Sequence, residues 1–456
     1  MKAKTDAVMA SVDLREPWIW SLLCVLFIPV FPEYIMPILA FFALLFAKKD
    51  AKRRYQRLRV GKAGKVFLAF LCYMTIHTFW SSAAVDGLMP LAYWYAALLV
   101  YLAAVTILTS RERLETALFL LSLVVGLLGL LSIVQYVCGM LGVEWMPVQV
   151  WDTVDEAVYR FLGMEVNLHT VGLRPAATFS NPNLFAQFLL MAMPFAAAFS
   201  FSGQRTAAKV VGRLGVVCGV GGLCLTFSRG AFLAIGAIAV VMCIANIRRL
   251  VPILMVLMSV IMLLPDSIYA RLSSMGNAAD IAIIERFDVW GVTMEAFLQR
   301  PVTGHGFGYM WSALVQNGFS APHAHNLFLH FLAEAGLVGL VLLLFLMWKL
   351  FRAGFELIIH APKTRMYGAA VIAFVAGVCV CGMVDYPLAT PKPLAMFVTA
   401  LAATDAMSVF EMKHASSTVG RALPFADRLT PRLEAWVKRK TDPKEGNEER
   451  KVKSEE

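Results

Sequence analysis

The sequence predicts an all-α, polytopic integral membrane protein with about 12 transmembrane helices and a large outer-face loop subdomain. Composition is the first reason: of 456 residues, 59% are hydrophobic and only 16% are charged. Soluble domains carry about 25% charged residues. Patterning is the second reason, because the charges concentrate in loops between long apolar runs. We therefore expect most of the chain to face lipid or other helices.

The apolar runs recur along residues 18–410, which we expect to form the membrane domain. Crossing the hydrocarbon core takes about 20 apolar residues in a helix, or somewhat fewer with polar anchors at its ends. The first two runs are short and separated by prolines, which is typical of a tight hairpin. The expected segments are roughly 18–32, 34–47, 66–80, 89–108, 117–138, 184–201, 210–227, 231–246, 250–264, 327–348, 368–384 and 394–410.

Alternate loops are rich in Lys and Arg, which is typical of the cytoplasmic side beside anionic lipid. The loop at 48–65 is the most basic. If the N-terminal tail, residues 1–17, is cytoplasmic, the polar tail 411–456 is cytoplasmic too, and we expect its end to be disordered. The other loops on that side then carry Arg111/Arg113, Arg205/Lys209/Arg213, Arg248/Arg249 and Lys349/Arg352/Lys363/Arg365. The net charge of +10 is thereby assigned to loops beside lipid, and we predict no nucleic-acid partner.

The eight cysteines each lie in or at the edge of an apolar run, and no CxxC pair occurs. Cysteines placed in this way usually act as small buried hydrophobic residues. We therefore expect neither disulfides nor a cysteine metal site.

Two long segments fall on the predicted outer face, at about 139–183 and 265–326. The second contains an amphipathic pattern near Ile281 to Leu298, which predicts a surface helix. It also contains the glycine-rich run Gly304–Gly308. No strand is predicted before that run, so it does not indicate a nucleotide-binding loop.

Four polar patches lie on the same face, where positive charge is normally depleted. Three of them contain Arg174, Arg229 and Arg286. A guanidinium offers a rigid fork of donors that suits phosphate oxygens. Converging arginines would bind a lipid diphosphate and stabilise it as a leaving group. Alternatively, each arginine pairs with a nearby acid or extends to lipid headgroups; Glu285 or Asp288 could satisfy Arg286, whereas Arg229 has no acid within several residues.

The fourth patch, His323–Asn326, lies where a helix is predicted to enter the membrane from outside. A neutral His325 could take a proton from an attacking hydroxyl near neutral pH. The alternative is an interfacial histidine that caps the helix or contacts a headgroup. A metal site built from His305, His323, His325 and His330 is a further alternative. No carboxylate or cysteine completes a recognised ligand spacing, so we expect no metal.

Together these patches resemble the O-antigen ligase and O-antigen polymerase (Wzy-type) superfamily of bacterial membrane glycosyltransferases. The resemblance covers roughly residues 170–345 and depends on the order and spacing of the patches, since no single patch is specific. The segments that carry it are Arg174-Pro175 through Asn181-Pro182-Asn183, Phe227–Gly230, Arg286 with Trp290, Pro301–Gly308, and Ala324–Leu327 with Glu334–Gly339.

The resemblance implies an inverting, metal-independent glycosyl transfer from an undecaprenyl-diphosphate-linked glycan, without a cofactor, in surface polysaccharide or lipopolysaccharide biosynthesis. It makes His325 the base that deprotonates the acceptor hydroxyl and makes Arg229 and Arg286 the residues that hold the diphosphate. Arg174 and Asn183 match the pattern less decisively and would order the outer loop. Asn326, within the histidine motif, would have a supporting role. The acceptor stays open between lipid A core, a growing polysaccharide, a protein and a wall polymer.

Two other classes of function compete with this interpretation. A transporter, such as a flippase or an anion carrier, usually places ionisable groups near the bilayer midplane and breaks helices there. In this sequence the strong candidates lie at the outer surface, and His77 is the exception. A non-catalytic scaffold of polysaccharide export is the other class. It predicts that His325→Ala leaves glycan assembly intact.

Overall fold

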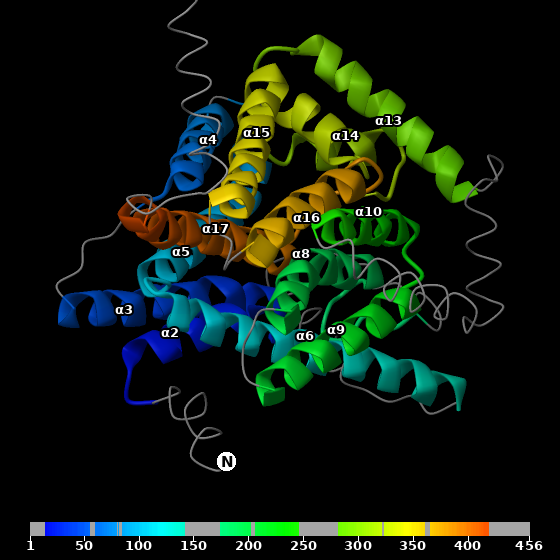
Figure 1. The fold of residues 1–456 in the computed structure, drawn as a ribbon. Helices are drawn as coiled ribbons and strands as arrows, with labels where there is room; N and C mark the ends of the chain where they lie inside the picture. Colours follow the sequence, from blue (N-terminus) through cyan, green and yellow to red (C-terminus); the bar gives the residue numbers. More distant parts are fainter. Residues whose placement is uncertain are drawn as a thin grey trace, which may run out of the picture. The chain divides into compact units, whose positions relative to one another are not determined.

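The computed structural model describes residues 14–54, 60–79, 81, 84–141, 174–201, 206–245, 281–321, 323–360 and 365–418. Every regular element in these ranges is a helix, as the sequence predicts (Figure 1). Contacts divide the chain into one unit through Phe410 and a second from Glu411 onward. In the second unit, the described residues continue the last helix to Thr418.

Several predictions fall outside the described residues. They include the expected segment 250–264, most of the outer loop 139–183, the first part of the loop 265–326 and the tail beyond Thr418. These predictions stay untested by the structure.

Each expected apolar segment within the described residues contains a helix, and the predicted amphipathic helix near Ile281 is α13. The elements are α2 (Pro17–Leu26), the 3-10 turns η2 (Ile28–Val30) and η3 (Glu33–Ile35), α3 (Met36–Arg53), α4 (Lys62–Phe79), α5 (Ala84–Ile107), α6 (Arg111–Met140), α8 (Pro182–Phe201), α9 (Thr206–Leu225), α10 (Arg229–Ala245), α13 (Ile281–Gln299), α14 (Tyr309–Gln316), α15 (Leu327–His360), α16 (Arg365–Gly382) and α17 (Pro391–Thr418).

Among the described helices, 6 are long and apolar enough to cross a membrane by length and composition: α5, α6, α8, α9, α15 and α16. Helices α2 and α10 are apolar but shorter. With 10 residues, α2 extends about 15 Å, roughly half the hydrocarbon core. The structure therefore supports a polytopic membrane protein but does not confirm the expected number of about 12 spans.

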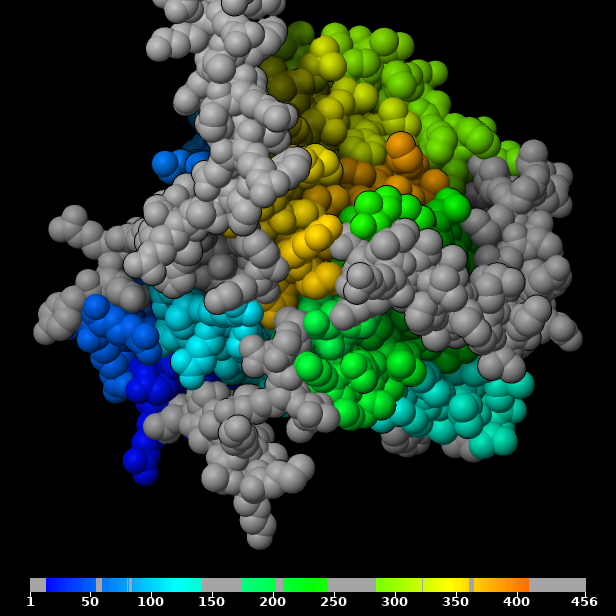
Figure 2. Space-filling view, in the orientation of Figure 1, coloured from blue at the N-terminus to red at the C-terminus, as the bar shows by residue number. Residues whose placement is uncertain are grey.

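Helix α8 has the largest buried share of these 6 candidates. It contacts α6, α9, α10 and α16, and α16 in turn packs against α10 and α15. One of these contacts is visible in the space-filling view, where α16 in orange lies against α10 in bright green (Figure 2). Through these contacts α16 joins the central helices to α15.

At one end of this unit, two basic loops contact each other. The charge pattern places both on the same side of the membrane. Asp50, late in α3, accepts two hydrogen bonds from Arg113, early in α6. Nearby in the fold, Asp405 of α17 accepts hydrogen bonds from the first backbone N–H groups of α4 and from Tyr101. The carboxylate thus caps the α4 N-terminus, whose N–H groups have no partner within the helix.

The loops assigned to the opposite side also contact one another. Thr178 donates to the carbonyl of Pro29 in η2, and its own carbonyl accepts a hydrogen bond from buried Lys392 at the start of α17. Gly308 packs against the backbone of Asp86. This end of the unit carries all the polar patches that the sequence singles out.

Candidate active site

The His323–Asn326 turn is built as a helix cap. The Asn326 side-chain oxygen accepts hydrogen bonds from the N–H groups of Phe328 and Leu329, at 3.0 and 3.1 Å. Its amide nitrogen donates to the carbonyl of Met383 at 2.9 Å. Asn326 therefore provides acceptors for two backbone N–H groups that have no partner within α15. It also connects the start of α15 to the end of α16.

Backbone strain coincides with the predicted patches. In the described residues, the non-glycine residues with positive φ are Ala177, Phe227 and His325, at 52, 54 and 46°. Each lies in one of the patches chosen from sequence. Left-handed backbone is costly for residues other than glycine and persists only where surrounding contacts enforce it. The turn thus holds His325 in a conformation that an isolated chain would rarely adopt.

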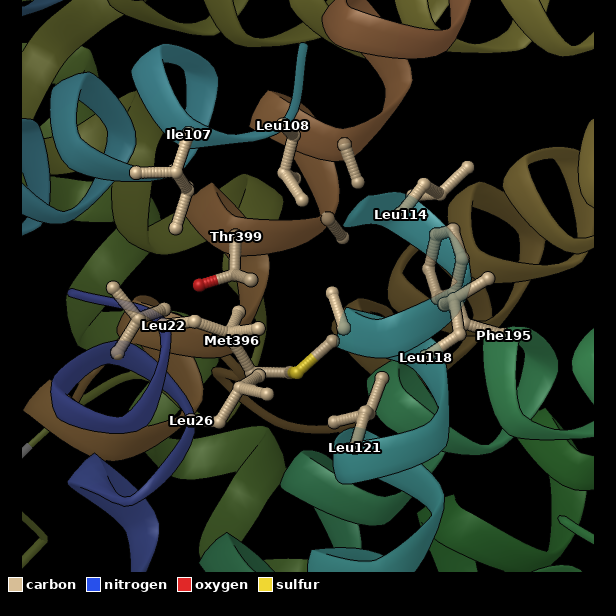
Figure 3. Close-up of a pocket in the computed structure, with 15 residues that line it drawn as sticks. Leu22, Leu26, Ile107, Leu108, Leu114, Leu118, Leu121, Phe195, Met396 and Thr399 are labelled. Atoms are coloured by element: carbon tan, nitrogen blue, oxygen red, sulfur yellow. The ribbon is translucent and has the colours of Figure 1, made fainter. Parts of the chain in front are cut away.

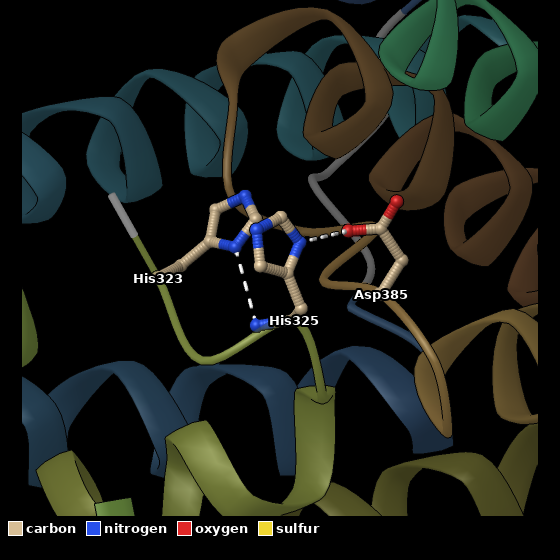
Figure 4. Close-up of side chains that lie close together, drawn as sticks. All are labelled: His323, His325 and Asp385. Atoms are coloured by element: carbon tan, nitrogen blue, oxygen red, sulfur yellow. Dashed lines mark hydrogen bonds and ion pairs between the residues drawn. The ribbon is translucent and has the colours of Figure 1, made fainter. Parts of the chain in front are cut away.

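His325 faces Asp385, a residue between α16 and α17 (Figure 4). Its Nδ1 lies 3.3 Å from Asp385 Oδ1, which also accepts the Tyr386 N–H at 2.8 Å. A carboxylate can only accept, so this contact places an imidazole proton on Nδ1. In the neutral tautomer that has this proton, the lone pair lies on Nε2. The His325 side chain is 26% exposed and that of Asp385 is 9% exposed, so the histidine can be reached while the acid is shielded.

The electrostatics favour an ionised Asp385. Burial alone would raise its pKa, but the hydrogen bond with His325, the electrostatic interactions with both imidazoles and the Tyr386 N–H together lower the pKa below its ordinary value. For His323, in contrast, a lowered pKa favours the uncharged form. Burial, followed by the electrostatic interaction with His325, lowers the pKa of His323 to about 3 despite the attraction of Asp385. His323 is therefore neutral at physiological pH.

The peptide of Ala324, next to the strained residue, is held on both sides. Trp290 of α13 donates from Nε1 to the Ala324 carbonyl at 2.9 Å. The Ala324 N–H points at His330 Nδ1, at 3.5 Å. His330 Nε2 lies 3.1 Å from Glu334. Because Trp290 and Arg286 are four residues apart on one helix, α13 links a predicted diphosphate ligand to the histidine turn.

Helix α15 is interrupted at Gly336, which has φ 64° and ψ −169°. The freed backbone groups are taken up by the segment that precedes α14: Leu337 donates to the Pro301 carbonyl, and Gly306 donates to the Glu334 carbonyl at 2.8 Å. At Gly304, with φ 75°, a Cβ atom would lie 2.5 Å from the Glu334 backbone. The glycine-rich run therefore permits close docking on the broken helix.

The arginines divide into two groups. Arg174 donates from Nε to the Thr226 carbonyl at 2.8 Å and from Nη2 to the side-chain oxygen of Asn183 at 2.9 Å. These two residues thus brace the turn that precedes Arg229. In this structure Arg174 is engaged by the loops, which matches the ordering role inferred for Arg174 and Asn183 more closely than direct phosphate binding.

The other two arginines approach the end of α16. Arg229 is the first residue of α10, and a Cβ atom on the adjacent Gly230 would lie 2.7 Å from Val384, which directly precedes Asp385. Arg286 is close enough to Cys381 for an electrostatic interaction. The segment 381–385 is therefore a meeting point for the elements that carry His325, Arg229 and Arg286.

Asp385 is the residue that sequence reasoning missed. It lies 60 positions from His325, so no local spacing reveals the contact. A signal was nevertheless present, because Asp385 directly follows the apolar run 368–384. A carboxylate at the outer end of a predicted span lies on the same face as the polar patches, and it could therefore contact them.

A separate pocket lies between α2, α5, α6 and α17 (Figure 3). Its volume is about 30 Å³, and its lining, which includes Leu22, Leu118 and Met396, contains no charged side chain. A diphosphate needs charged or strongly polar donors, so this pocket does not suit the headgroup of the predicted donor.

The fold and the site define a helical membrane protein with a histidine–aspartate pair and arginine-bearing elements at one end. Residues 214–344 match the family model described as O-antigen ligase. The match confirms the resemblance to the O-antigen ligase and polymerase superfamily over these residues. It includes Arg229, Arg286 and His325, and it ends before Asp385. A comparison with curated proteins finds no match.

Proposed function

We propose that the protein transfers a glycan from an undecaprenyl-diphosphate donor to an acceptor hydroxyl on the outer face of the cytoplasmic membrane. The observation that carries the proposal is the strained His325 turn, with Nδ1 directed at Asp385. The elements that bear Arg229 and Arg286 lie beside it. A base and a set of cations are the groups that this reaction requires.

In the proposed reaction, His325 Nε2 removes the proton from the acceptor hydroxyl while the oxygen attacks the anomeric carbon of the donor. A new glycosidic bond forms, and the bond between that carbon and the phosphate oxygen breaks on the opposite face, so the configuration inverts. The electron pair leaves with the diphosphate, whose growing charge is stabilised by Arg229 and Arg286. Asp385 keeps the imidazole oriented and stabilises the imidazolium as it forms.

The outer-face location is part of the proposal. It is supported by the contacts among the loops at the site's end and by the pairing of basic loops at the other end through Arg113 and Asp50. A positive-inside orientation would make that second end cytoplasmic and the site external. The acceptor is then a hydroxyl of lipid A core, a polysaccharide, a protein or a wall polymer.

A transporter is the competing function, and the break in α15 is the observation that favours it. Transporters interrupt helices where the free backbone groups line a cavity. At Gly336 those groups are instead bonded to residues 301–306 and to Tyr73. The break therefore anchors a folded segment, and we favour the transferase.

The test is glycan transfer by purified protein in nanodiscs with a lipid-diphosphate glycan donor. Wild type is compared with His325→Ala and with His360→Ala, which alters an exposed histidine at the far end of α15. We expect transfer by wild type and His360→Ala and its loss, by about 10²-fold or more, in His325→Ala. A folded wild type that transfers nothing across several donors and acceptors would contradict the proposal.

A further inference from the structure

Two histidines and an aspartate form a compact cluster at the site. One ligating atom from each of His323, His325 and Asp385 lies within 4.8 Å of the others. The two histidines come from one turn, and the aspartate comes from beyond α16 (Figure 4). The carboxylate that was missing from the local sequence spacing is therefore supplied by the tertiary fold.

We propose that these three side chains bind a zinc ion and that zinc inhibits the enzyme by occupying the base. Imidazole nitrogens and a carboxylate oxygen are the donors that zinc accepts, and three protein ligands leave a fourth position for water. The inhibitory part of this inference rests on the proposed function, whereas the binding part does not.

The geometry is close to that of a tetrahedral site. Zinc–ligand bonds of about 2.0–2.1 Å place neighbouring ligand atoms about 3.3 Å apart. His325 Nδ1 and Asp385 Oδ1 already lie 3.3 Å apart, so the ion would replace the proton between them. Since the cluster spans at most 4.8 Å, the remaining ligand must approach by no more than roughly 1.5 Å. His323 packs edge-on against His325, with ring centroids 4.5 Å apart, and its Nδ1 accepts the backbone N–H of His325 at 3.4 Å.

Inhibition follows from the tautomer. In the proposed reaction Nδ1 carries the proton and Nε2 accepts one from the substrate. With zinc on Nδ1, the ring proton of neutral His325 must move to Nε2, which then has no lone pair for the acceptor hydroxyl. The ion would also neutralise Asp385, which otherwise orients the ring.

Binding is tested with Zn²⁺ alone, by competition with a zinc indicator on purified protein in nanodiscs. Free cysteines such as exposed Cys72 provide background sites, so the comparison is between variants. We expect His323→Gln to bind one equivalent less than wild type, and His323→Cys to retain that equivalent because a thiolate also ligates zinc. Equal binding by wild type and His323→Gln would overturn the proposal. If both His323 variants lose the equivalent, His323 is only structural and the proposal also fails.

Inhibition is tested in the transfer assay, with each variant compared to its own zinc-free rate. Zinc should slow wild type at least about tenfold, a chelator should restore the rate, and His323→Gln should need at least about tenfold more zinc for the same effect. Transfer that zinc slows equally in both proteins would contradict the zinc site and leave the proposed function standing. If zinc binds at His323 but the protein transfers no glycan, the zinc site stands and the proposed function fails.

Discussion

Two pairings of an acidic with a basic side chain lie at opposite ends of the helical unit and differ in almost every respect. Asp50 and Arg113 form two hydrogen bonds of 2.8 and 2.9 Å, and their side chains are 1% and 4% exposed. Arg113 also donates to the Ile107 carbonyl and stacks on Trp18. His325 and Asp385 share one contact of 3.3 Å, and the histidine is 26% exposed.

We interpret the Asp50–Arg113 pair as stabilising the fold and the His325–Asp385 pair as taking part in the proposed reaction. The Arg113 guanidinium has its hydrogen bonds, its counter-charge and its stacking partner within the fold, so the pair fixes α3 against α6. His325 keeps one ring nitrogen available and occupies a strained backbone position. A long hydrogen bond in a free enzyme is compatible with one that tightens around substrate. The more buried of the two pairs is thus the one that we assign to the fold. Burial of a charged pair is therefore not enough to identify a functional site.

The largest effect should come from breaking the saturated pair. Arg113→Met removes both hydrogen bonds between Arg113 and buried Asp50 and leaves the half-exposed Arg54, 3.3 Å away, as a counter-charge. Breaking a buried pair typically costs about 3–5 kcal/mol. We expect a corresponding drop in the free energy of unfolding, measured by denaturant titration in detergent, with transfer per folded molecule unchanged. Arg111→Met is the control, because its pair with Glu115 is more exposed and should be worth about 0–1 kcal/mol. Equal losses in both variants would contradict the comparison.

Removing the carboxylate from the other pair should act on rate instead. Asp385→Asn keeps the shape but loses the charge and no longer fixes the Nδ1 proton of His325. We expect a fall in transfer of about 10²-fold, smaller than the loss known for a comparable carboxylate-to-amide change in a serine protease triad. Asp385→Glu should recover part of the rate. A structural role for Asp385 would lower the unfolding midpoint without this dependence on charge.

The arginines near the end of α16 should contribute less individually. In the proposed reaction Arg229 and Arg286 hold the donor diphosphate. We therefore expect Arg229→Ala and Arg286→Ala each to lose about 1.5 kcal/mol or more, tenfold in rate or beyond. Rates are measured with the lipid-diphosphate donor at limiting concentration. Arg352→Ala, at a side chain that is 57% exposed, serves as the control. Wild-type kinetics in both site variants, with correct insertion, would exclude these residues as diphosphate ligands.

The smallest effect should come from the link between α13 and the histidine turn. Trp290→Phe keeps an aromatic ring but loses the hydrogen bond to the Ala324 carbonyl, worth about 1 kcal/mol or fivefold in rate. Trp311→Phe alters an exposed tryptophan on α14 and should leave the rate unchanged. If Trp290→Phe transfers glycan as fast as the control, α13 does not position the base.

Much of the fold follows from local sequence because apolar runs of helical length leave few alternatives in lipid. The number of spans does not follow, since α2 and α10 are short among the described helices and the expected segment 250–264 lies outside the described residues. In the site, the patches with Arg229, Arg286 and His325 could be chosen by charge and placement. Asp385 could not be paired with His325, because only tertiary packing of α16 against α15 brings them together.

The most direct test measures transfer rate and unfolding free energy together in His325→Ala and Arg113→Met. We expect His325→Ala to lose transfer by about 10²-fold or more at nearly unchanged stability. Arg113→Met should lose about 3–5 kcal/mol of stability and keep its rate per folded molecule. Transfer that persists in His325→Ala, or disappears in folded Arg113→Met, would contradict the assignment of chemistry to one pair and structure to the other.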